Sequence, residues 1–373
     1  MTIPLPVLVS DRQIVAEIRN GIGLLTLNRA GALNALSLPM LRDLTTLLLA
    51  WRDDPNVKGI FVRGALQDGK GVAFCAGGDI RFFHQAALAG DPRLEDFFTE
   101  EYALNHLIHG YPKPYVAWMD GVVMGGGMGI SQGAAMRIVT ERTKMAMPET
   151  NIGLFPDVGG GWFLSRCPGH AGEYLALCGQ VLGAGDAIAL GLADAYLPAA
   201  ALSDLLAALE TQTIATEADW LRLVRARVQP GPGPQIAERL ADIDRHFSES
   251  SVADIMASLR ADPGEWAQAT LAAMGKRSPL MMSVTLEQIR RGRSMNLAEN
   301  LRMERDLVRN SFHLRPGAAS ETVEGIRALA VDKDHAPRWN PASLEAVTED
   351  MVHDFFVSPW PAHAHPLRHL DGR

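Results

Sequence analysis

The sequence has few cysteines and no long apolar run. Three cysteines occur among 373 residues; such a sparse, odd set builds no disulfide framework, so we expect a reducing compartment, with the cytoplasm as the default. No stretch of 18 apolar residues occurs, so no membrane-spanning helix is expected. The first 13 residues contain one arginine and one aspartate, and we expect neither a signal peptide nor a transit peptide there.

Two common phosphate-binding patterns are also missing. The dinucleotide pattern G-x-G-x-x-G fails because, counting from Gly127 and Gly129, the last position is Gln132. The G-x-x-x-x-G-K-[ST] pattern of P-loop proteins does not occur. A net charge of −8 argues against nucleic acid as the main partner. A hydrophobic content of 47% with 21% charged residues is ordinary for a globular enzyme.

Strand-like and helix-like segments alternate over the first half of the chain. Apolar runs at 14–18 and 22–27 meet at Asn20-Gly21, a dipeptide that takes positive φ easily and favours a tight hairpin. Ser37 is the N-cap candidate of a helix that follows. Further strands are expected at 57–63, 115–119 and 136–140. This alternation predicts an α/β fold with stacked or parallel sheets.

The second half has a different character, because strand-like runs almost vanish after about residue 205. We therefore predict an α/β core over 10–205, a helical region over 206–357 packed on that core, and a loose tail over 358–373. Asn296 with Glu299 resembles a capping pair at the start of one late helix. The tail carries His363, His365 and His369. We expect them to be solvated, because structural zinc sites usually include cysteine.

Two glycine-rich segments could supply backbone donors. One is Cys75-Ala76-Gly77-Gly78-Asp79-Ile80, and the other is Gly125-Gly126-Gly127, which is expected to open a helix. Free N–H groups and the helix dipole at such a place favour an anion or a polarised oxygen. The alternative is that these glycines only permit close packing of a helix on a strand.

Two carboxylates eight residues apart complete the candidate chemistry. Glu149 follows Pro148 within an apolar stretch, so we expect it to be partly desolvated, with a raised pKa and greater reactivity toward a bound electrophile. Asp157 lies between Pro156 and a glycine run, on a shaped loop. Glu101 is ambiguous, because alone it reads as a helix-surface charge. Backbone donors with a carboxylate are the groups that acyl chemistry requires.

Two apparent nucleophiles are discounted. Residues 129–133 match G-x-S-x-G, but Ser131 falls inside the helix expected after the glycine run, whereas a nucleophile elbow needs a strand directly before the serine. Cys75 with His84 as its base is a second possibility. Nothing in the sequence brings these two side chains together, and the neighbours of Cys75 indicate a buried turn.

Taken together, these motifs resemble the enoyl-CoA hydratase/isomerase (crotonase) superfamily over roughly residues 12–200. The segments that carry this resemblance are the Cys75–Ile80 run, Asp120-Gly121 with Gly125–Gly127, Ala146–Glu149, Ile152-Gly153 and Gly159-Gly160. A narrower resemblance to its 3-hydroxyisobutyryl-CoA hydrolase branch extends over nearly the whole chain. It rests on Glu100–Tyr102, Lys113–Val116, Met147–Thr150, Leu154–Gly160, Gly325–Ala328, Asp332–Asp334 and Trp339–Pro341.

The resemblance implies a spiral of ββα units with C-terminal helices covering the site. It places the thioester oxygen between the N–H groups of Gly78 and Gly126 and makes Glu149 the catalytic glutamate. It gives Asp157 and Glu101 polar contacts near the acyl group. The adenine end of coenzyme A would lie near Ala35, Ala76 and Ile80. The implied partner is a small acyl-CoA, with no metal and no cofactor beyond the coenzyme A of the substrate, and homo-oligomers built from trimers are a possible assembly.

One departure favours hydrolysis over hydration. The hydratases of this family use two carboxylates around one water, and the second lies where this chain has Gly129. The resemblance therefore implies hydrolysis of a short, branched 3-hydroxyacyl-CoA, as in valine catabolism. Glu149 would either attack the carbonyl or activate water. An enoyl-CoA hydratase or isomerase in which Asp157 substitutes remains an alternative, as does an inactive protein that binds acyl-CoA.

Overall fold

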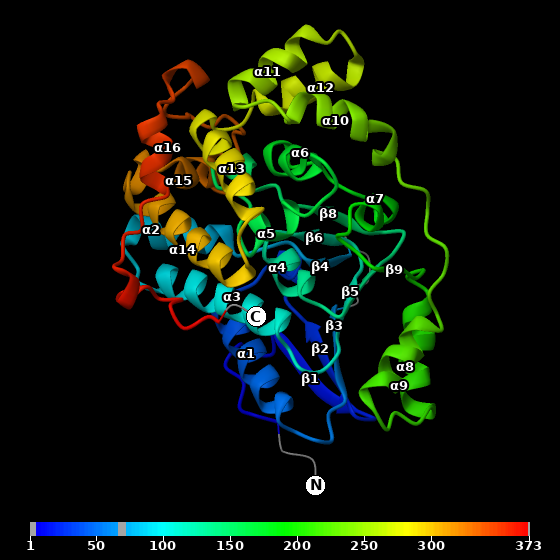
Figure 1. The fold of residues 1–373 in the computed structure, drawn as a ribbon. Coiled ribbons are helices and arrows are strands. Elements are labelled where there is room, and N and C mark those ends of the chain that lie inside the picture. The colour runs from blue at the N-terminus through cyan, green and yellow to red at the C-terminus, as the bar shows by residue number, and fades with distance from the viewer. Residues whose placement is uncertain (1–4, 66–71, 372–373) are drawn as a thin grey trace. The chain divides into compact units, whose positions relative to one another are not determined.

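The computed structural model describes residues 5–65 and 72–371 (Figure 1). Its strands are β1 (Ile14–Arg19), β2 (Ile22–Leu27), β3 (Gly59–Gly64), β4 (Ala73–Cys75), β5 (Tyr115–Met119), β6 (Val122–Met124), β7 (Met136–Val139), β8 (Lys144–Ala146) and β9 (Ala195–Tyr196). Its α-helices up to residue 225 are α1 (Leu38–Arg52), α2 (Ile80–Ala89), α3 (Arg93–His109), α4 (Gly126–Gln132), α5 (Gly160–Leu164), α6 (Ala171–Cys178), α7 (Ala184–Ala189), α8 (Ala201–Thr211) and α9 (Glu217–Arg225). The later α-helices are α10 (Leu240–Phe247), α11 (Val252–Ala261), α12 (Glu265–Met274), α13 (Pro279–Gly292), α14 (Leu297–His313), α15 (Glu321–Ile326) and α16 (Glu349–Phe355).

The strands form a larger and a smaller sheet. Among the described residues, six strands make the larger sheet in the order β1-β2-β3-β5-β7-β9, and three make the smaller one in the order β4-β6-β8. β1 and β2 pair antiparallel through Asn20-Gly21, where φ is 49° and 80°. The other pairs of the larger sheet are parallel. The predicted hairpin and the predicted α/β class are confirmed.

The chain alternates between these two sheets as it advances. β3, β5 and β7 lie in the larger sheet, and each is followed by a strand of the smaller sheet. Each strand pair then leads into a helix: α2 after β4, α4 after β6, and the turn η2 (Glu149–Ile152) with α5 after β8. This repeat is the spiral of ββα units that the resemblance implies.

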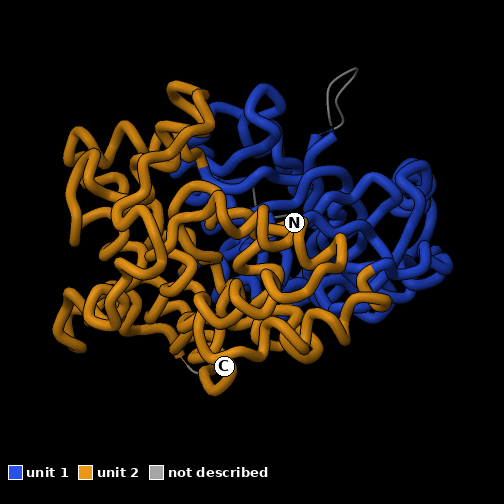
Figure 2. Tube along the Cα trace, turned by 90° about the horizontal axis from the view of Figure 1, so that it is seen from above, with its two compact units in different colours: residues 1–78, 103–145, 181–235 blue, residues 79–102, 146–180, 236–373 orange. Residues whose placement is uncertain are grey.

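Two compact units interleave along the chain (Figure 2). Unit 1 comprises residues 1–78, 103–145 and 181–235, and unit 2 comprises residues 79–102, 146–180 and 236–373. The sequence instead predicts three consecutive regions, with breaks near residues 205 and 357. The local composition indicates where helices replace strands along the chain. It does not indicate which distant segments pack together into one unit.

The core of unit 1 lies where α8 and α9 cover one face of the larger sheet. Leu205 and Leu209 of α8 and Trp220 of α9 are buried in one cluster with alternate residues of the strands. The ring of Phe61 meets the rings of Trp118 and Trp220 edge-on, with centroids 6.3 and 5.9 Å apart. These two helices, predicted to belong with the C-terminal region, are therefore part of unit 1.

Unit 2 is mostly helical, and α14 packs against α5, α15 and α16 (Figure 1). The side chain of Asn296 accepts from the N–H of Glu299, and the Glu299 carboxylate accepts from the N–H of Asn296 in return, both at 2.9 Å. This reciprocal capping box begins α14 where the sequence predicts it. The apolar face of this helix is buried, at Leu297, Leu301, Val308 and Phe312.

The last described residues pack against α14 rather than forming a loose tail. Leu367 is fully buried and His365 is 5% exposed, with its Nε2 3.3 Å from Oδ1 of Asp306. The side chain of Arg302 donates to the carbonyl of Leu370 at 3.0 Å. The buried Leu367 and these two polar contacts hold the segment in place, although its composition alone suggests that it is solvated. Residues 372 and 373 of the predicted tail lie outside the described residues.

Neither a metal cluster nor a membrane span is seen in the part of the chain that the structure describes. There, no three His, Cys, Asp or Glu residues are grouped so as to hold a metal ion. No helix of the same described ranges combines the length and the apolar character needed to cross a bilayer.

Candidate active site

Two glycine turns of unit 1 follow β4 and β6, which are parallel neighbours and therefore end at the same edge of the smaller sheet. Gly77 has φ of 104°, and a Cβ added there would stand 3.8 Å from the backbone nitrogen of Gly126. A Cβ on Gly127 would lie 2.4 Å from the carbonyl oxygen of Cys75. Gly127 therefore has no room for a side chain, whereas at Gly77 it is the positive φ that favours glycine. Gly126 begins α4, where the first N–H groups have no intrahelical acceptor.

The loop before α1 runs beside the first of these turns. The N–H of Leu36 donates to the carbonyl of Gly77 at 2.8 Å, and the N–H of Ala76 donates to the carbonyl of Leu33 at 3.0 Å. These two bonds place Ala35 and Ala76, both half-buried, on adjacent segments of backbone. Two of the three residues that the resemblance assigns to the adenine therefore lie together in unit 1.

The turn that carries Glu149 lies in unit 2 and is held by α15. Glu149 is 7% exposed, and its Oε2 has no hydrogen-bond partner among the residues that the structure describes. The Thr322 hydroxyl donates to the carbonyl of Gly153 at 2.7 Å. A Cβ on Gly325 would lie 2.3 Å from the carbonyl of Ile152, so α15 packs directly on the backbone of the turn. The result is a buried carboxyl with one oxygen free for a ligand.

A second turn of unit 2 carries Asp157, and its backbone is strained. Val158 has φ of 54° and Gly159 has φ of 92°. Positive φ is unusual for a β-branched residue and persists only where the surroundings enforce it. The hydroxyl of Tyr102 donates to Oδ2 of Asp157 at 2.9 Å. Glu304 of α14 accepts from the N–H groups of Gly159 at 2.7 Å and Gly161 at 2.9 Å.

Four buried carboxyls of unit 2 influence one another. Burial, and then the charges of Asp157 and Glu149, raise the pKa of Glu101 well above its usual range. Burial, and then Asp157, raise the pKa of Glu149 in the same way, with Glu304 adding to the effect. Burial raises the pKa of Asp157 to about 6, although the Tyr102 hydroxyl opposes the rise. Burial also raises the pKa of Glu304 to about 8. These raised pKa values indicate that the four carboxyls are not all ionised at neutral pH.

The predicted site residues divide evenly between the two units. Unit 1 contains Ala35, Ala76, Gly78 and Gly126, and unit 2 contains Ile80, Glu101, Glu149 and Asp157. Ile80 is the first residue of α2, directly after the N-cap Asp79, whose carboxylate accepts from the N–H of Phe82 at 3.2 Å. Glu101 is 2% exposed. Of the two interpretations that the sequence leaves open for Glu101, the helix-surface charge is therefore excluded.

The sequence did not predict the supporting contacts of three side chains. Asn34 is fully buried, and its side chain joins the N–H of Arg29 to the carbonyl of Ala73, each at 2.9 Å. Tyr102 and Glu304 hold the Asp157 turn, as described above. A signal was present for Glu304: with Asn300 it forms a polar pair, four residues apart, on the apolar face of α14.

Neither suspected nucleophile is supported. The hydroxyl of Ser131 donates to the carbonyl of Gly127 at 2.8 Å inside α4, so it lies on no strand-to-helix elbow. Cys75 is fully buried in β4. Both observations agree with the sequence interpretation.

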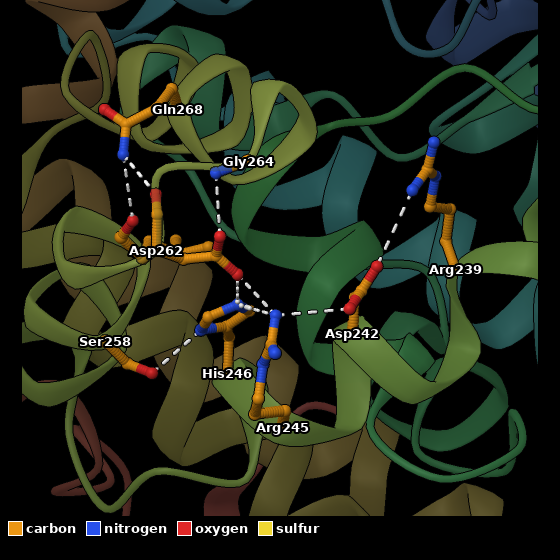
Figure 3. A network of polar contacts seen from close by, with 9 residues as sticks. Arg239, Asp242, Arg245, His246, Ser258, Asp262, Gly264 and Gln268 are labelled. Atoms are coloured by element: carbon orange, nitrogen blue, oxygen red, sulfur yellow. Dashed lines mark hydrogen bonds and ion pairs between the residues drawn. The ribbon is translucent and has the colours of Figure 1, made fainter.

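A second polar network of unit 2 has the residue types of a catalytic triad (Figure 3). Nδ1 of His246 lies 2.8 Å from the hydroxyl of Ser258, and its Nε2 lies 3.2 Å from Oδ2 of Asp262. Ser258 sits inside α11, where the backbone N–H groups are used by the helix and no oxyanion donor is presented. Asp262 also accepts from the N–H of Gly264 at 2.8 Å. The network therefore ties α10, α11 and the start of α12 together.

The spiral of ββα units, the paired glycine turns and the buried glutamate are the features of the crotonase fold. The family model described as enoyl-CoA hydratase/isomerase matches residues 22–356. The chain belongs to this family.

Individual relatives span almost the whole chain. The chain is 40% identical to "3-hydroxyisobutyryl-CoA hydrolase, mitochondrial" of Xenopus laevis, over 90% of this chain and 86% of the relative. Among solved structures, a carnitinyl-CoA dehydratase from Mycobacterium thermoresistibile is 36% identical, with a TM-score of 0.85 and coverage of 96% of this chain and 99% of the other. An enoyl-CoA hydratase from Rhodobacter sphaeroides 2.4.1 is also 36% identical, with a TM-score of 0.83 and coverage of 93% and 98%.

Proposed function

We propose that this protein hydrolyses a short, branched 3-hydroxyacyl-CoA thioester to coenzyme A and the free 3-hydroxy acid. The observation that carries the proposal is the buried carboxyl of Glu149, with one oxygen unpartnered among the described residues, in a chain where Gly129 replaces the second carboxylate of the hydratases. The name of the Xenopus relative supports the same activity. The reaction belongs to the class of steps that release a branched hydroxy acid, as in valine catabolism.

Each site residue receives one role in this reaction. The N–H groups of Gly78 and Gly126 stabilise the negative charge that develops on the thioester oxygen. Asp157, together with Glu101, binds the 3-hydroxyl of the acyl group. Ala35, Ala76 and Ile80 receive the adenine end of the coenzyme. No metal and no further cofactor is needed, because a thiolate leaves readily without a strong acid.

We propose that Glu149 is the nucleophile. Its carboxylate attacks the thioester carbon, the carbon–sulfur bond breaks, and coenzyme A thiolate departs. Water then opens the mixed anhydride, which returns Glu149 and releases the acid. Because burial raises the pKa of Glu149, the glutamate must lose its proton before it attacks. We therefore expect kcat to rise with pH until this carboxyl is ionised, as a pH–rate profile would measure.

Labelled water distinguishes attack by Glu149 from direct attack by water. In ¹⁸O water with enzyme in excess, attack by Glu149 followed by hydrolysis of the anhydride at the protein carbonyl labels the glutamate and leaves the first product unlabelled. Direct attack of water labels the first product and never labels the protein. Mass spectrometry of the peptide containing Met147 to Phe155 would measure whether Glu149 carries ¹⁸O. An unlabelled peptide beside a labelled product would exclude attack by Glu149 with opening of the anhydride at the protein carbonyl.

Hydration of an enoyl-CoA is the second candidate, since the Rhodobacter sphaeroides structure with 36% identity is named an enoyl-CoA hydratase. Asp157 would then have to supply the second carboxylate. Purified protein should be tested with 3-hydroxyisobutyryl-CoA, isobutyryl-CoA and crotonyl-CoA, following both thiol release and enoyl absorbance. Faster hydration than hydrolysis would overturn our proposal. Coenzyme A binding without any turnover would identify an acyl-CoA-binding protein instead.

Assembly and location are also proposed. We expect a homo-oligomer built from trimers, as the family resemblance implies, and light scattering on the eluting protein would measure its mass. The three cysteines are buried and form no disulfide among the described residues, which supports a reducing compartment such as the cytoplasm. The Xenopus relative is named mitochondrial, so immunodetection in fractionated cells should compare these two compartments.

A further inference from the structure

Glu304 lies at the centre of a set of N–H donors. It is fully buried, and its Oε2 accepts from the N–H of Gly159 at 2.7 Å. Its Oε1 accepts from the N–H of Gly161 at 2.9 Å, from Asn300 Nδ2 at 2.7 Å and from Gln288 Nε2 at 3.1 Å. All four partners are donors, which favours the ionised carboxylate and opposes the rise in pKa that burial causes.

These bonds surround the Asp157 turn on both sides. Gln288 also donates to the carbonyl of Pro156 at 2.6 Å. The turn is therefore anchored just before Asp157, at Pro156, and just after it, at Gly159 and Gly161. The strained Val158, with φ of 54°, lies between these anchors. Such a backbone conformation relaxes when the contacts that enforce it are removed.

The packing around Glu304 leaves this turn little room to move. A Cβ on Gly161 would lie 2.5 Å from Oδ1 of Asn300, and a Cβ on Gly292 would lie 2.2 Å from the carbonyl of Gly161. Helices α13 and α14 thus touch the backbone of the turn directly. Glu304 supplies the acceptors that this close contact requires.

We propose that Glu304 is the positioning residue that fixes the turn carrying Asp157, and that the preference for 3-hydroxyacyl substrates depends on it. Glu304 acts through the backbone of the turn and does not itself contact the substrate. The second half of this inference rests on the proposed function, because it assigns the substrate hydroxyl to Asp157.

The substitution that tests this is Glu304→Gln. The amide keeps the shape of the side chain but turns one acceptor into a donor, which then faces N–H groups. The matched control is Glu287→Gln, the same chemical change on α13, where the carboxylate of Glu287 accepts from Arg291 Nε at 2.7 Å at the half-exposed surface. Asn300→Ala is a milder variant, since it removes one donor to Glu304 and leaves both backbone bonds of the turn.

The first measurement is amide hydrogen exchange in a peptide covering residues 155–165, with thermal unfolding as the check on folding. Glu304→Gln should speed exchange by about tenfold or more, as the loss of roughly one hydrogen bond implies. Asn300→Ala should act in the same direction by a smaller factor, and Glu287→Gln should match wild type. Unchanged exchange in both Glu304→Gln and Asn300→Ala would overturn the positioning role.

The second measurement is the ratio of kcat/KM for 3-hydroxyisobutyryl-CoA to that for isobutyryl-CoA. Glu304→Gln should lower this ratio by about tenfold, and should lower it little further in an Asp157→Ala background, because both changes disable the same contact. General damage to the fold would reduce both substrates equally, and that result would overturn the inference. If wild type hydrolyses neither substrate, the proposed function fails, while the exchange experiment still decides whether Glu304 holds the turn.

Discussion

The glycine turns of unit 1 and the carboxyl turns of unit 2 are built in different ways. In unit 1 the geometry comes from the backbone: two short parallel strands end side by side, and glycines let the following turns approach. In unit 2 the turns of Glu149 and Asp157 are held by side chains from α14 and α15. In the first region backbone groups set the geometry, and in the second it is set by side chains that lie 145 and 169 residues from the turns they hold.

This difference has a chemical reason. A backbone donor is placed once the strand and turn are placed, and it carries no charge that must be compensated. Burial raises the pKa of a carboxyl, and specific hydrogen-bond donors oppose that rise. Asp157 and Glu304 have such donors, whereas Oε2 of Glu149 has none among the described residues. The carboxyl to which we assign the chemistry is thus one of two in this group with an unpartnered oxygen, since Oε1 of Glu101 also has no partner among the described residues.

The largest expected effect is that of Glu149→Gln. Turnover should fall by at least about a thousandfold while coenzyme A binding stays near the wild-type value, because the glutamate serves the reaction and affinity comes from the coenzyme. Single-turnover thiol release and calorimetric titration with coenzyme A would measure the two effects. Ser131→Ala is the control and should retain the chemistry. Turnover of Glu149→Gln within about tenfold of wild type would mean that another residue is catalytic.

The next largest effect tests the backbone-built region with Gly127→Ala. The added Cβ would meet the carbonyl oxygen of Cys75 at 2.4 Å, so the second turn must shift away from the first. We expect kcat to fall by about 100- to 1000-fold, as when one oxyanion donor is lost. Gly183→Ala is the control, because a Cβ there meets nothing within 4 Å. Equal activity of the two variants would contradict a role for these turns in catalysis.

What could be predicted from the sequence also differs between these two regions. The sequence predicts the hairpin at Asn20-Gly21, the helix capped by Ser37 and the glycine turns, because each has a recognisable pattern within its own segment. Glu149 and Asp157 stand out because a carboxyl in an apolar loop is unusual. The contacts that hold their turns could not be predicted, since Glu304 lies 145 residues from Gly159. Hydrophobic periodicity shows which face of α14 is buried, but it does not show what a polar residue on that face will meet.

A smaller and more selective effect is expected for Asp157→Ala. Hydrolysis of 3-hydroxyisobutyryl-CoA should fall by about 10- to 100-fold more than hydrolysis of isobutyryl-CoA, because only the first substrate loses a partner for its hydroxyl. Steady-state kcat/KM for the two thioesters would measure the difference. Equal losses would show that Asp157 supports the turn or the charge balance of the site rather than the hydroxyl.

The smallest effect tests whether the Glu149 turn also depends on a distant side chain. Thr322 lies 169 residues from Gly153, and its hydroxyl donates to the Gly153 carbonyl at 2.7 Å in a buried place. Thr322→Val keeps the shape of the side chain and leaves this carbonyl without its donor, which should destabilise the protein by about 1 kcal/mol.

The same change should lower kcat by about fivefold, since losing one hydrogen bond loosens the turn without removing the carboxyl. Thr322→Ser restores the donor and should restore kcat, even if the missing methyl group costs some stability. Denaturant unfolding and kcat measured on the same preparations separate the two contributions. If Thr322→Val lost stability but kept full kcat, packing of Gly325 on Ile152 would be enough to position Glu149. The Glu149 turn would then resemble the backbone-built turns of unit 1 more than the Asp157 turn beside it in sequence.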